Sequence, residues 1–221
     1  MIKTQLTVGC FVVGAITALT TGPAAAQAAL GPYLSLGLGY DKVPDRDLNI
    51  NGHVVSSQWK PGWGGIAAVG YKWFFGLRTE GEFSGRVSWV KTFNHANPWT
   101  GTQWDNSLMF NALYDFETGF PITPYIGGGL GVTQVQWGNN FRVPTQATPT
   151  IYDAESIRSG WQGIAGLTWA VTPQIALAVD YRIKGAFGGF GFPGSVAGKF
   201  INDFHYETRT VVASIRYAFN P

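Results

Sequence analysis

Residues 77–89 alternate between two kinds of side chain, and this period of two constrains the fold more than any other feature of the sequence. The odd positions are apolar or small, namely Leu77, Thr79, Gly81, Phe83, Gly85, Val87 and Trp89. The even positions are charged or carry hydroxyl groups, namely Arg78, Glu80, Glu82, Ser84, Arg86 and Ser88. Because successive side chains of a β-strand point to opposite faces, the pattern predicts a strand between two different environments.

The composition indicates which environments these are. Charged residues make up 13% of the chain, whereas ~25% is typical of a soluble domain. Aromatic residues reach 15%, and there are 30 glycines. A soluble β-barrel of this size needs a charged exterior, so a β-rich chain this poor in charge is expected to have a non-aqueous one. The formal net charge of +2 is too small to indicate a nucleic-acid partner.

The first 28 residues have the pattern of a secretory signal peptide. Lys3 precedes an apolar stretch over residues 6–19, and Ala26-Gln27-Ala28 fits an A-x-A cleavage site. We predict a cleaved signal over residues 1–28 and a single barrel domain over residues 29–221. An uncleaved anchor helix is disfavoured, because the apolar stretch is shorter than the ~20 residues of a helical span. The single cysteine, Cys10, lies in the signal. We therefore expect no disulfide, no thiol chemistry and no cysteine-based metal site in the mature chain. Separately, no cofactor is expected.

Eight segments after the signal have the character of strands. Most are close to the ~9–11 residues that a tilted strand needs to cross a bilayer, and no stretch approaches the ~18 apolar residues of a helical span. The segments are residues 32–41, 63–74, 77–89, 104–116, 124–135, 160–170, 175–183 and 206–219.

The connections between these segments alternate in length. Residues 74–76, 117–123 and 170–174 form short turns, whereas residues 42–62, 90–103, 136–159 and 184–205 form long loops. This alternation is typical of outer-membrane barrels, which keep their short turns and both termini on the periplasmic side. We predict an all-β fold, an eight-stranded antiparallel up-and-down transmembrane β-barrel with four long extracellular loops. Closure is required, because an open sheet edge in hydrocarbon would leave backbone groups unpaired.

Aromatic residues fall at both ends of the predicted strands. Indole and phenol rings settle at the level of the lipid headgroups, because they combine an apolar body with a hydrogen-bonding edge. A soluble core would not sort them to both rims. We therefore predict one girdle at the long-loop end, formed by Tyr40, Trp63, Trp89, Trp104, Trp161 and Tyr181. A second girdle is predicted at the short-turn end, formed by Trp73, Phe116, Trp169 and Phe219.

The same alternation places charged side chains inside the barrel. The predicted network in this lumen consists of Lys72, Arg78, Glu80, Glu82, Arg86, Asp115, Asp180, Arg182 and Arg216. It could line an ion path or form a polar core that fills the barrel. The core is favoured, because eight strands leave an interior only just wide enough for its own side chains. The paired carboxylates of Glu80 and Glu82 could suggest acid–base catalysis. Their predicted position inside a filled barrel disfavours this interpretation.

The fourth long loop is the candidate contact surface. It places Phe187, Phe190, Phe192 and Phe200 among glycines. An exposed apolar loop is suited to binding a partner, but it could equally fold over the rim and shield the mouth of the barrel. These two interpretations stay open at this point.

Several segments carry a resemblance to a known family. They are LRTEGEFSGR, LMFNALYDF with ITPYIGGGLGV, GWQGIAGLTWAVTPQIALAVDYRI and the terminal SIRYAF. Together they resemble the outer-membrane β-barrel superfamily that holds the transmembrane domain of outer membrane protein A and the opacity-type surface antigens of Gram-negative bacteria. The resemblance implies residence in the outer membrane, contact with its lipid and lipopolysaccharide, and recognition of the aromatic terminal pattern at Tyr217 and Phe219 by the barrel assembly machinery.

Three functional hypotheses follow. Members of the superfamily serve as envelope components, adhesins, surface antigens or small pores, and fold alone does not decide among such roles. The leading hypothesis is a non-enzymatic membrane protein with a structural or surface-interaction role through its loops, where an unidentified protein partner would bind. The second is a narrow channel for ions or small solutes, and the third is a membrane-embedded enzyme. No nucleic-acid partner is expected.

Overall fold

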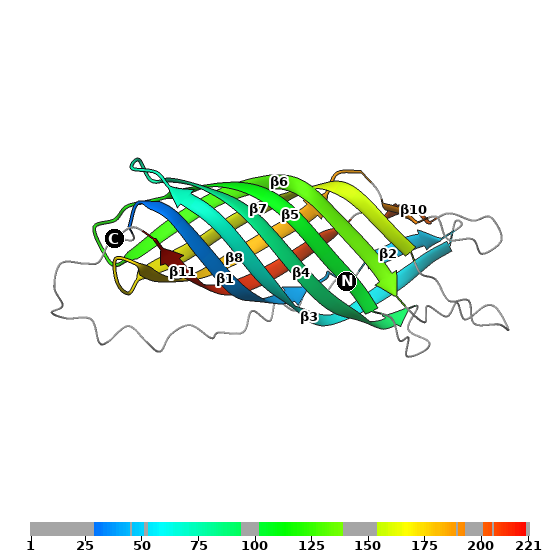
Figure 1. The fold of residues 1–221 in the computed structure, drawn as a ribbon. Helices are drawn as coiled ribbons and strands as arrows, with labels where there is room; N and C mark the ends of the chain where they lie inside the picture. The colour runs from blue at the N-terminus through cyan, green and yellow to red at the C-terminus, as the bar shows by residue number, and fades with distance from the viewer. Residues whose placement is uncertain are drawn as a thin grey trace.

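The computed structural model describes residues 29–44, 46–50, 53–93, 102–138, 154–188, 190–192, 201–204 and 206–219. In these residues the regular structure is all β (Figure 1). None of these residues forms a helix that is long and apolar enough to cross a membrane.

Eight long strands close into a barrel. Each pairs antiparallel with its neighbours in the chain, and β1 pairs with both β3 and β11, which completes the circle. The prediction of an eight-stranded antiparallel barrel is therefore confirmed. The strands of the wall are β1 (Gly31–Lys42), β3 (His53–Lys72), β4 (Leu77–Phe93), β5 (Thr102–Asp115), β6 (Ile122–Gly138), β7 (Ala154–Ala170), β8 (Ile175–Ala186) and β11 (Glu207–Ala218).

Several strands extend further toward the long loops than the sequence predicted. β3 begins at His53 rather than at residue 63, and β7 begins at Ala154 rather than at residue 160. Pro61 lies just before the predicted start of this segment, and proline lacks the N–H that a strand donates. The pairing of β3 with β4 shifts register between Lys60 and Trp63, so the proline lies at an irregularity of the ladder and the strand continues past it.

Two predicted loops contain further strands. In the first, β2 (Arg46–Ile50) pairs with the beginning of β3 to form a hairpin. In the fourth, β9 (Phe190–Phe192) pairs with β10 (Ile201–Phe204). A hairpin in water does not require an apolar face toward lipid, so the membrane-spanning alternation used to find strands did not detect these.

Short turns and both ends of the described chain lie at the same end of the barrel. The turn between β3 and β4 is closed by a 2.8 Å hydrogen bond from Trp73 N to Leu77 O, and Gly76 adopts a φ of 82°. Glycine suits this left-handed conformation because it lacks a Cβ. Ala29 N donates to Pro173 O in the turn between β7 and β8, and Phe219 N donates to Pro32 O.

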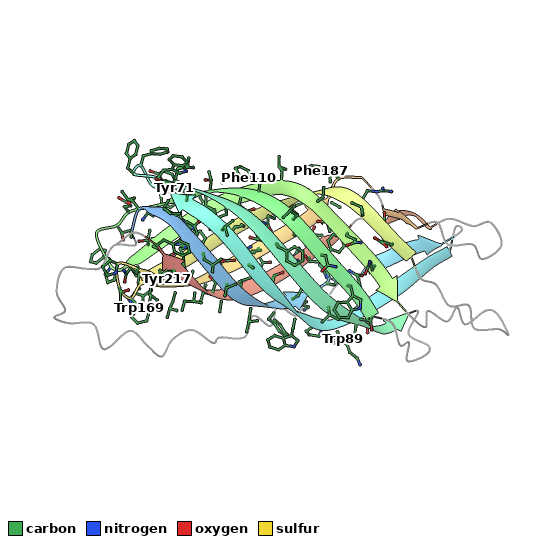
Figure 2. All side chains as sticks on the ribbon, viewed as in Figure 1. Tyr71, Trp89, Phe110, Trp169, Phe187 and Tyr217 are labelled. Carbon is green, nitrogen blue, oxygen red and sulfur yellow. The ribbon has the colours of Figure 1, made fainter. Side chains whose placement is uncertain are left out.

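The wall has an apolar outer face and a polar inner face. In β4, Phe83 is 55% exposed whereas Glu82 is fully buried, so the apolar positions of residues 77–89 point outward and the charged positions point inward. Figure 2 shows the labelled side chains of Tyr71, Phe110 and Tyr217 standing off the outside of the barrel. The outward apolar face predicted on other strands is likewise exposed at Leu34, Leu36, Leu38, Val69, Leu130, Leu167, Leu177, Val179 and Ile215.

We expect Phe83→Arg to impair folding into a membrane, because a cation on the lipid face near mid-bilayer costs about 2–4 kcal/mol. Phe83→Leu, which keeps the site apolar, is the matched control. The measurement is the fraction of protein that shows heat-modifiable migration in detergent gels after refolding into lipid vesicles. Equal refolding of the two variants would contradict the outward placement of Phe83.

Candidate functional site

The lumen, meaning the space enclosed by the inner face of the wall, holds the charged groups of the barrel. Twelve of its charged side chains are at most 7% exposed, and they divide into six cations and six anions. The cations are Lys72, Arg78, Arg86, Arg182, Lys184 and Arg216. The anions are Asp41, Glu80, Glu82, Asp105, Asp115 and Asp180. All nine residues proposed for the lumen from the sequence lie in this set.

Sequence reasoning missed three members of the set. Asp105 shares the inward parity of Asp115 on β5, so the alternation could have found it. Lys184 continues the parity of Asp180 and Arg182, but the predicted strand ended before it. Asp41 was included in a predicted strand without being assigned to the lumen. Inward cations and anions of the described strands are thus equal in number. This balance suits a buried region, where an unpaired charge lowers the stability of the fold.

Near the short-turn end, Arg78 is the centre of a group that we call the lower cluster. Its Nε donates to Asp115 Oδ1 at 2.7 Å, and its Nη1 donates to Glu80 Oε1 at 2.9 Å. The hydroxyl of Tyr33 donates to the same Glu80 oxygen at 2.6 Å. Lys72 Nζ lies 3.8 Å from Asp115 Oδ2, so each carboxylate of the cluster faces a cation.

Two tyrosine rings support the arginines of the lower cluster. The guanidinium carbon of Arg78 lies 4.7 Å from the centre of the Tyr125 ring, and that of Arg216 lies 4.9 Å from the centre of the Tyr33 ring. These distances suit cation–π contacts. Gly70 makes room for Tyr33, because a Cβ there would lie 2.5 Å from the ring. The inward glycine therefore accommodates an aromatic ring.

Halfway along the lumen, Glu82 is the acceptor of what we call the middle cluster. Arg182 Nη1 donates to its Oε2 at 2.5 Å, and Asn111 Nδ2 donates to the same oxygen at 2.9 Å. Gln162 Nε2 donates to Asn111 Oδ1 at 2.7 Å. Gly129 lies beside Asn111, where a Cβ would meet the amide oxygen at 2.0 Å. The bonds that the Glu82 carboxylate accepts are charge-assisted, and such hydrogen bonds are stronger than neutral ones.

Asp180 extends the middle cluster across β8. Arg182 Nε donates to its Oδ1 at 2.5 Å, and the Tyr125 hydroxyl donates to its Oδ2 at 2.7 Å. Arg182 therefore bridges two carboxylates, one on β4 and one on its own strand. The lower and middle clusters also share Tyr125, since its ring lies under Arg78.

Toward the long-loop end, an upper cluster forms around Asp105 and Lys184. Lys184 Nζ donates to Asp105 Oδ1 at 2.7 Å and to Ser107 Oγ at 2.5 Å. Ser107 Oγ also lies 3.0 Å from Asp105 Oδ1 and donates to it. The three side chains come from β5 and β8, on different sides of the lumen, so the cluster spans the barrel.

The opposite side of the upper cluster is built on Asp41 and Arg86. The Thr210 hydroxyl donates to Asp41 Oδ1 at 2.6 Å, and Arg86 Nη1 donates to Thr208 Oγ1 at 2.8 Å. Arg86 Nη1 also lies 3.8 Å from Asp41 Oδ1. Arg86 and Asp41 are thus too far apart for a direct hydrogen bond, and each forms a hydrogen bond with a threonine hydroxyl instead.

Little free volume is left between the lower and middle clusters. A cavity there has a volume of about 10 Å³ and is bordered by Arg78, Glu80, Asp180, Arg182 and Arg216. That volume is at the lower limit for one water molecule. Arg216 contributes polar groups to this border. Its Nε and Nη1 have no protein hydrogen-bond partner in the described part of the chain.

Glu80 and Glu82 are not arranged like a catalytic pair. Each accepts bonds from an arginine, and Glu80 also accepts from Tyr33 while Glu82 accepts from Asn111. Both are almost fully buried, so neither carboxylate is open to a substrate. Among the described residues, no group of three or more histidine, cysteine or acidic side chains could hold a metal ion.

The aromatic residues proposed as girdles lie on the outer face near the strand ends. Nine of them are 39–61% exposed, whereas Trp161 is half-buried because its ring covers Gly185, its partner on β8. Neighbouring rings pack together, as in the pair of Tyr40 and Trp63, whose ring centres are 5.3 Å apart. Their settlement at headgroup level stays a prediction.

Two of the four phenylalanines proposed as a loop contact belong to β9, namely Phe190 and Phe192. Phe187 follows β8 and is 54% exposed (Figure 2). Phe200 lies outside the described residues. The structure therefore brings an exposed phenylalanine and a short hairpin to the same rim.

Removing the acceptor of the middle cluster should destabilise the barrel. We expect Glu82→Ala to lower the free energy of unfolding by about 3–5 kcal/mol, because Arg182 would keep a buried charge with one partner fewer. Urea titration of the protein in lipid vesicles measures this.

Glu207→Gln is the control, since Glu207 forms a largely exposed pair with Arg209 at 3.3 Å and such pairs contribute at most about 1 kcal/mol. Equal unfolding free energies for the two variants would show that the middle cluster does not stabilise the fold.

Comparisons with known proteins agree with this architecture. A family described as outer membrane protein beta-barrel domain matches residues 11–219. The structure is similar to Neisserial surface protein A, with 18% identity, 87% of this chain and 100% of that chain covered, and a TM-score of 0.53. It is also similar to outer membrane protein OprG from Pseudomonas aeruginosa, with 14% identity, 88% and 98% covered, and a TM-score of 0.52. These two likenesses concern the fold alone.

A curated relative is an uncharacterized protein of Brucella abortus (strain 2308). It is 28% identical over 188 residues, which cover 68% of this chain. The chain spans 66% of the length of that relative.

Proposed function

Since the chain belongs to the outer membrane protein β-barrel domain family, we propose that it is a non-enzymatic barrel with a structural or surface-interaction role exercised through its extracellular loops. Its location is the outer membrane of a Gram-negative bacterium. The outer face of the wall contacts the lipid of that membrane. The more specific partners, which are lipopolysaccharide, the barrel assembly machinery and a protein bound at the loops, are part of the proposal.

The filled lumen is the observation that carries this proposal. Three charge clusters follow one another along the barrel, and the cavity between the lower and middle ones has a volume of about 10 Å³. Arg182 joins Glu82 to Asp180, so an ion would have to displace an arginine that bridges two buried carboxylates to pass. This arrangement favours a polar core over a path for solutes. We therefore expect the protein to interact with partners through its surfaces at the long-loop end.

The strand lengths support a role at the cell surface. β3 has 20 residues, and β4, β6 and β7 have 17 each, whereas ~9–11 suffice to cross a bilayer. The extra residues of β3 lie at the long-loop end, where β2 pairs with them (Figure 1). A paired hairpin presents its residues with less conformational entropy to lose on binding than a free loop would.

We expect the purified protein to show little or no steady conductance in planar lipid bilayers, because buried charged side chains crowd the lumen. The double variant Glu82→Ala/Arg182→Ala, which removes a cation and an anion together, should conduct measurably if it folds. Large and stable openings of the unmodified protein would favour the channel hypothesis instead.

The orientation can be tested with introduced cysteines, because Cys10 is the only cysteine of the chain and lies in the predicted signal. We expect Asn49→Cys on β2 to react with a membrane-impermeant maleimide in intact cells. Gln174→Cys, in the turn between β7 and β8, should react only after the outer membrane is permeabilised. The reverse pattern would mean that the long-loop end faces the periplasm.

Shortening the β2–β3 hairpin separates the two roles. We expect cells in which an Asn-Gly turn replaces residues 46–57 to keep a heat-modifiable barrel. If the role is surface interaction, their attachment to glass and their aggregation, measured by sedimentation, should fall. If the role is structural, the shortened barrel should restore the detergent resistance of a deletion strain. Two results together would contradict both roles. Cells with the shortened barrel would attach as well as cells with the full barrel, and the shortened barrel would fail to restore the detergent resistance of the deletion strain.

A further inference from the structure

The outer face of the wall has a groove where small residues interrupt the apolar surface. It crosses from β1 to β5, has a volume of about 420 Å³, and its lining is almost entirely apolar. Its floor is a row of directly paired residues, since Leu38 pairs with Gly65, Gly65 with Gly85, and Gly85 with Asn106. Residues paired in this way share one face of a sheet.

Larger side chains form the two sides of the groove. On the long-loop side, the next outward row runs from Tyr40 through Trp63 and Val87 to Trp104. On the short-turn side, the next row includes Phe83 and Leu108, which are 55% and 59% exposed. The glycines thus lie in a trough between rows of bulky side chains, and this shape fits a flexible hydrocarbon chain.

One end of the groove is polar. Asn106 faces outward beside Gly85, where a Cβ on the glycine would lie 3.2 Å from the Asn106 Oδ1. Strands of such barrels are tilted by about 35–45°, so a row that crosses the strands also climbs along the barrel. Asn106 lies just below the aromatic Trp104 on its own strand. This outward amide can form a hydrogen bond with a polar group of a lipid at the β5 end of the groove.

Three cations point outward beyond the long-loop side of the groove. Lys42 follows Tyr40 on β1 and pairs directly with Arg209 on β11. Lys60 on β3 pairs with Trp89, which is labelled in Figure 2. All three cations are exposed.

The pairing of Lys42 with Arg209 places like charges opposite each other, and this costs stability unless an anion lies between them. Glu207 lies 3.3 Å from Arg209, so among the described side chains one carboxylate accompanies the three cations. The described side chains of the patch thus carry an excess of positive charge at the long-loop end of the outer face.

We propose that these two features form one binding site for a phosphate-bearing lipid of the outer leaflet. Its phosphate would bind to Lys42, Lys60 and Arg209, and one acyl chain would lie in the groove over Gly65 and Gly85. Charge complementarity selects an anionic lipid over a zwitterionic one. The site would hold one lipid of the surrounding leaflet against one side of the barrel. This binding would be a property of the outer face of the wall, separate from the lumen and the loops.

The test measures the binding of diphosphorylated lipid A to the full barrel in detergent micelles, by native mass spectrometry. Dephosphorylated lipid A and phosphatidylcholine are the comparison lipids, and millimolar inorganic phosphate is the competitor. We expect diphosphorylated lipid A to bind more tightly than either comparison lipid. Inorganic phosphate should not displace it, because the groove holds the acyl chain.

Variants probe the two halves of the site separately. Lys42→Gln/Lys60→Gln should weaken binding about fivefold for each lysine, which corresponds to about 1 kcal/mol per charge near a membrane surface. Gly65→Leu should weaken binding severalfold by filling the groove. A Cβ at Gly65 meets no atom within 4 Å, so this variant should fold.

Gly163→Leu is the matched control for the groove, because Gly163 is on β7, away from the groove, and a Cβ there also meets no atom within 4 Å. It should bind diphosphorylated lipid A like the unmodified protein. Heat-modifiable migration verifies the fold of every variant.

Three outcomes would overturn the proposal. Equal binding of phosphorylated and dephosphorylated lipid A would remove the charge argument. Undiminished binding by Gly65→Leu would remove the groove. A dimer of the unmodified protein that Gly65→Leu abolishes, with lipid binding unchanged, would assign the groove to a second copy of the chain.

Discussion

Hydrocarbon offers no hydrogen bonds to the backbone, and the rest of this structure depends on that constraint. Each N–H and C=O within the membrane must find its partner in the wall, so the sheet must close. β1 supplies the closure by pairing with β3 on one side and with β11 on the other. Irregular pairing, such as the shift between Lys60 and Trp63, occurs toward the long-loop end of β3, where water can satisfy the groups left unpaired.

Closure with so few strands makes the interior narrow, and the narrowness determines how its charges are held. Long side chains reach across the lumen, as Arg182 does from β8 to Glu82 on β4. Inward glycines such as Gly70 and Gly129 provide the space that Tyr33 and Asn111 occupy. The result is a polar core in which the charges of opposite sign are equal in number among the described strands. We therefore assign recognition to the outside and the rim of the barrel.

The outer face is less uniform than its apolar composition suggests. Most outward rows carry large apolar side chains, but the row through Gly65 and Gly85 is hollow and ends in a polar Asn106. Cations stand beyond it on three adjacent strands, β11, β1 and β3. Lipid in contact with a barrel is usually treated as solvent, whereas this combination of shape and charge is specific enough to select a lipid.

The sequence by itself determined the barrel architecture and the inward direction of the nine charged side chains proposed for the lumen. Period two is a local property, so the alternation of residues 77–89 was enough to place Phe83 outside and Glu82 inside, and short and long connections were enough to order the strands. Only the tertiary structure decided which charges meet. Glu82 and Arg182 are 100 residues apart, and their contact depends on the registers of every intervening strand pair around the closed wall. The row that joins Leu38 to Asn106 depends on the same registers, which no local pattern encodes.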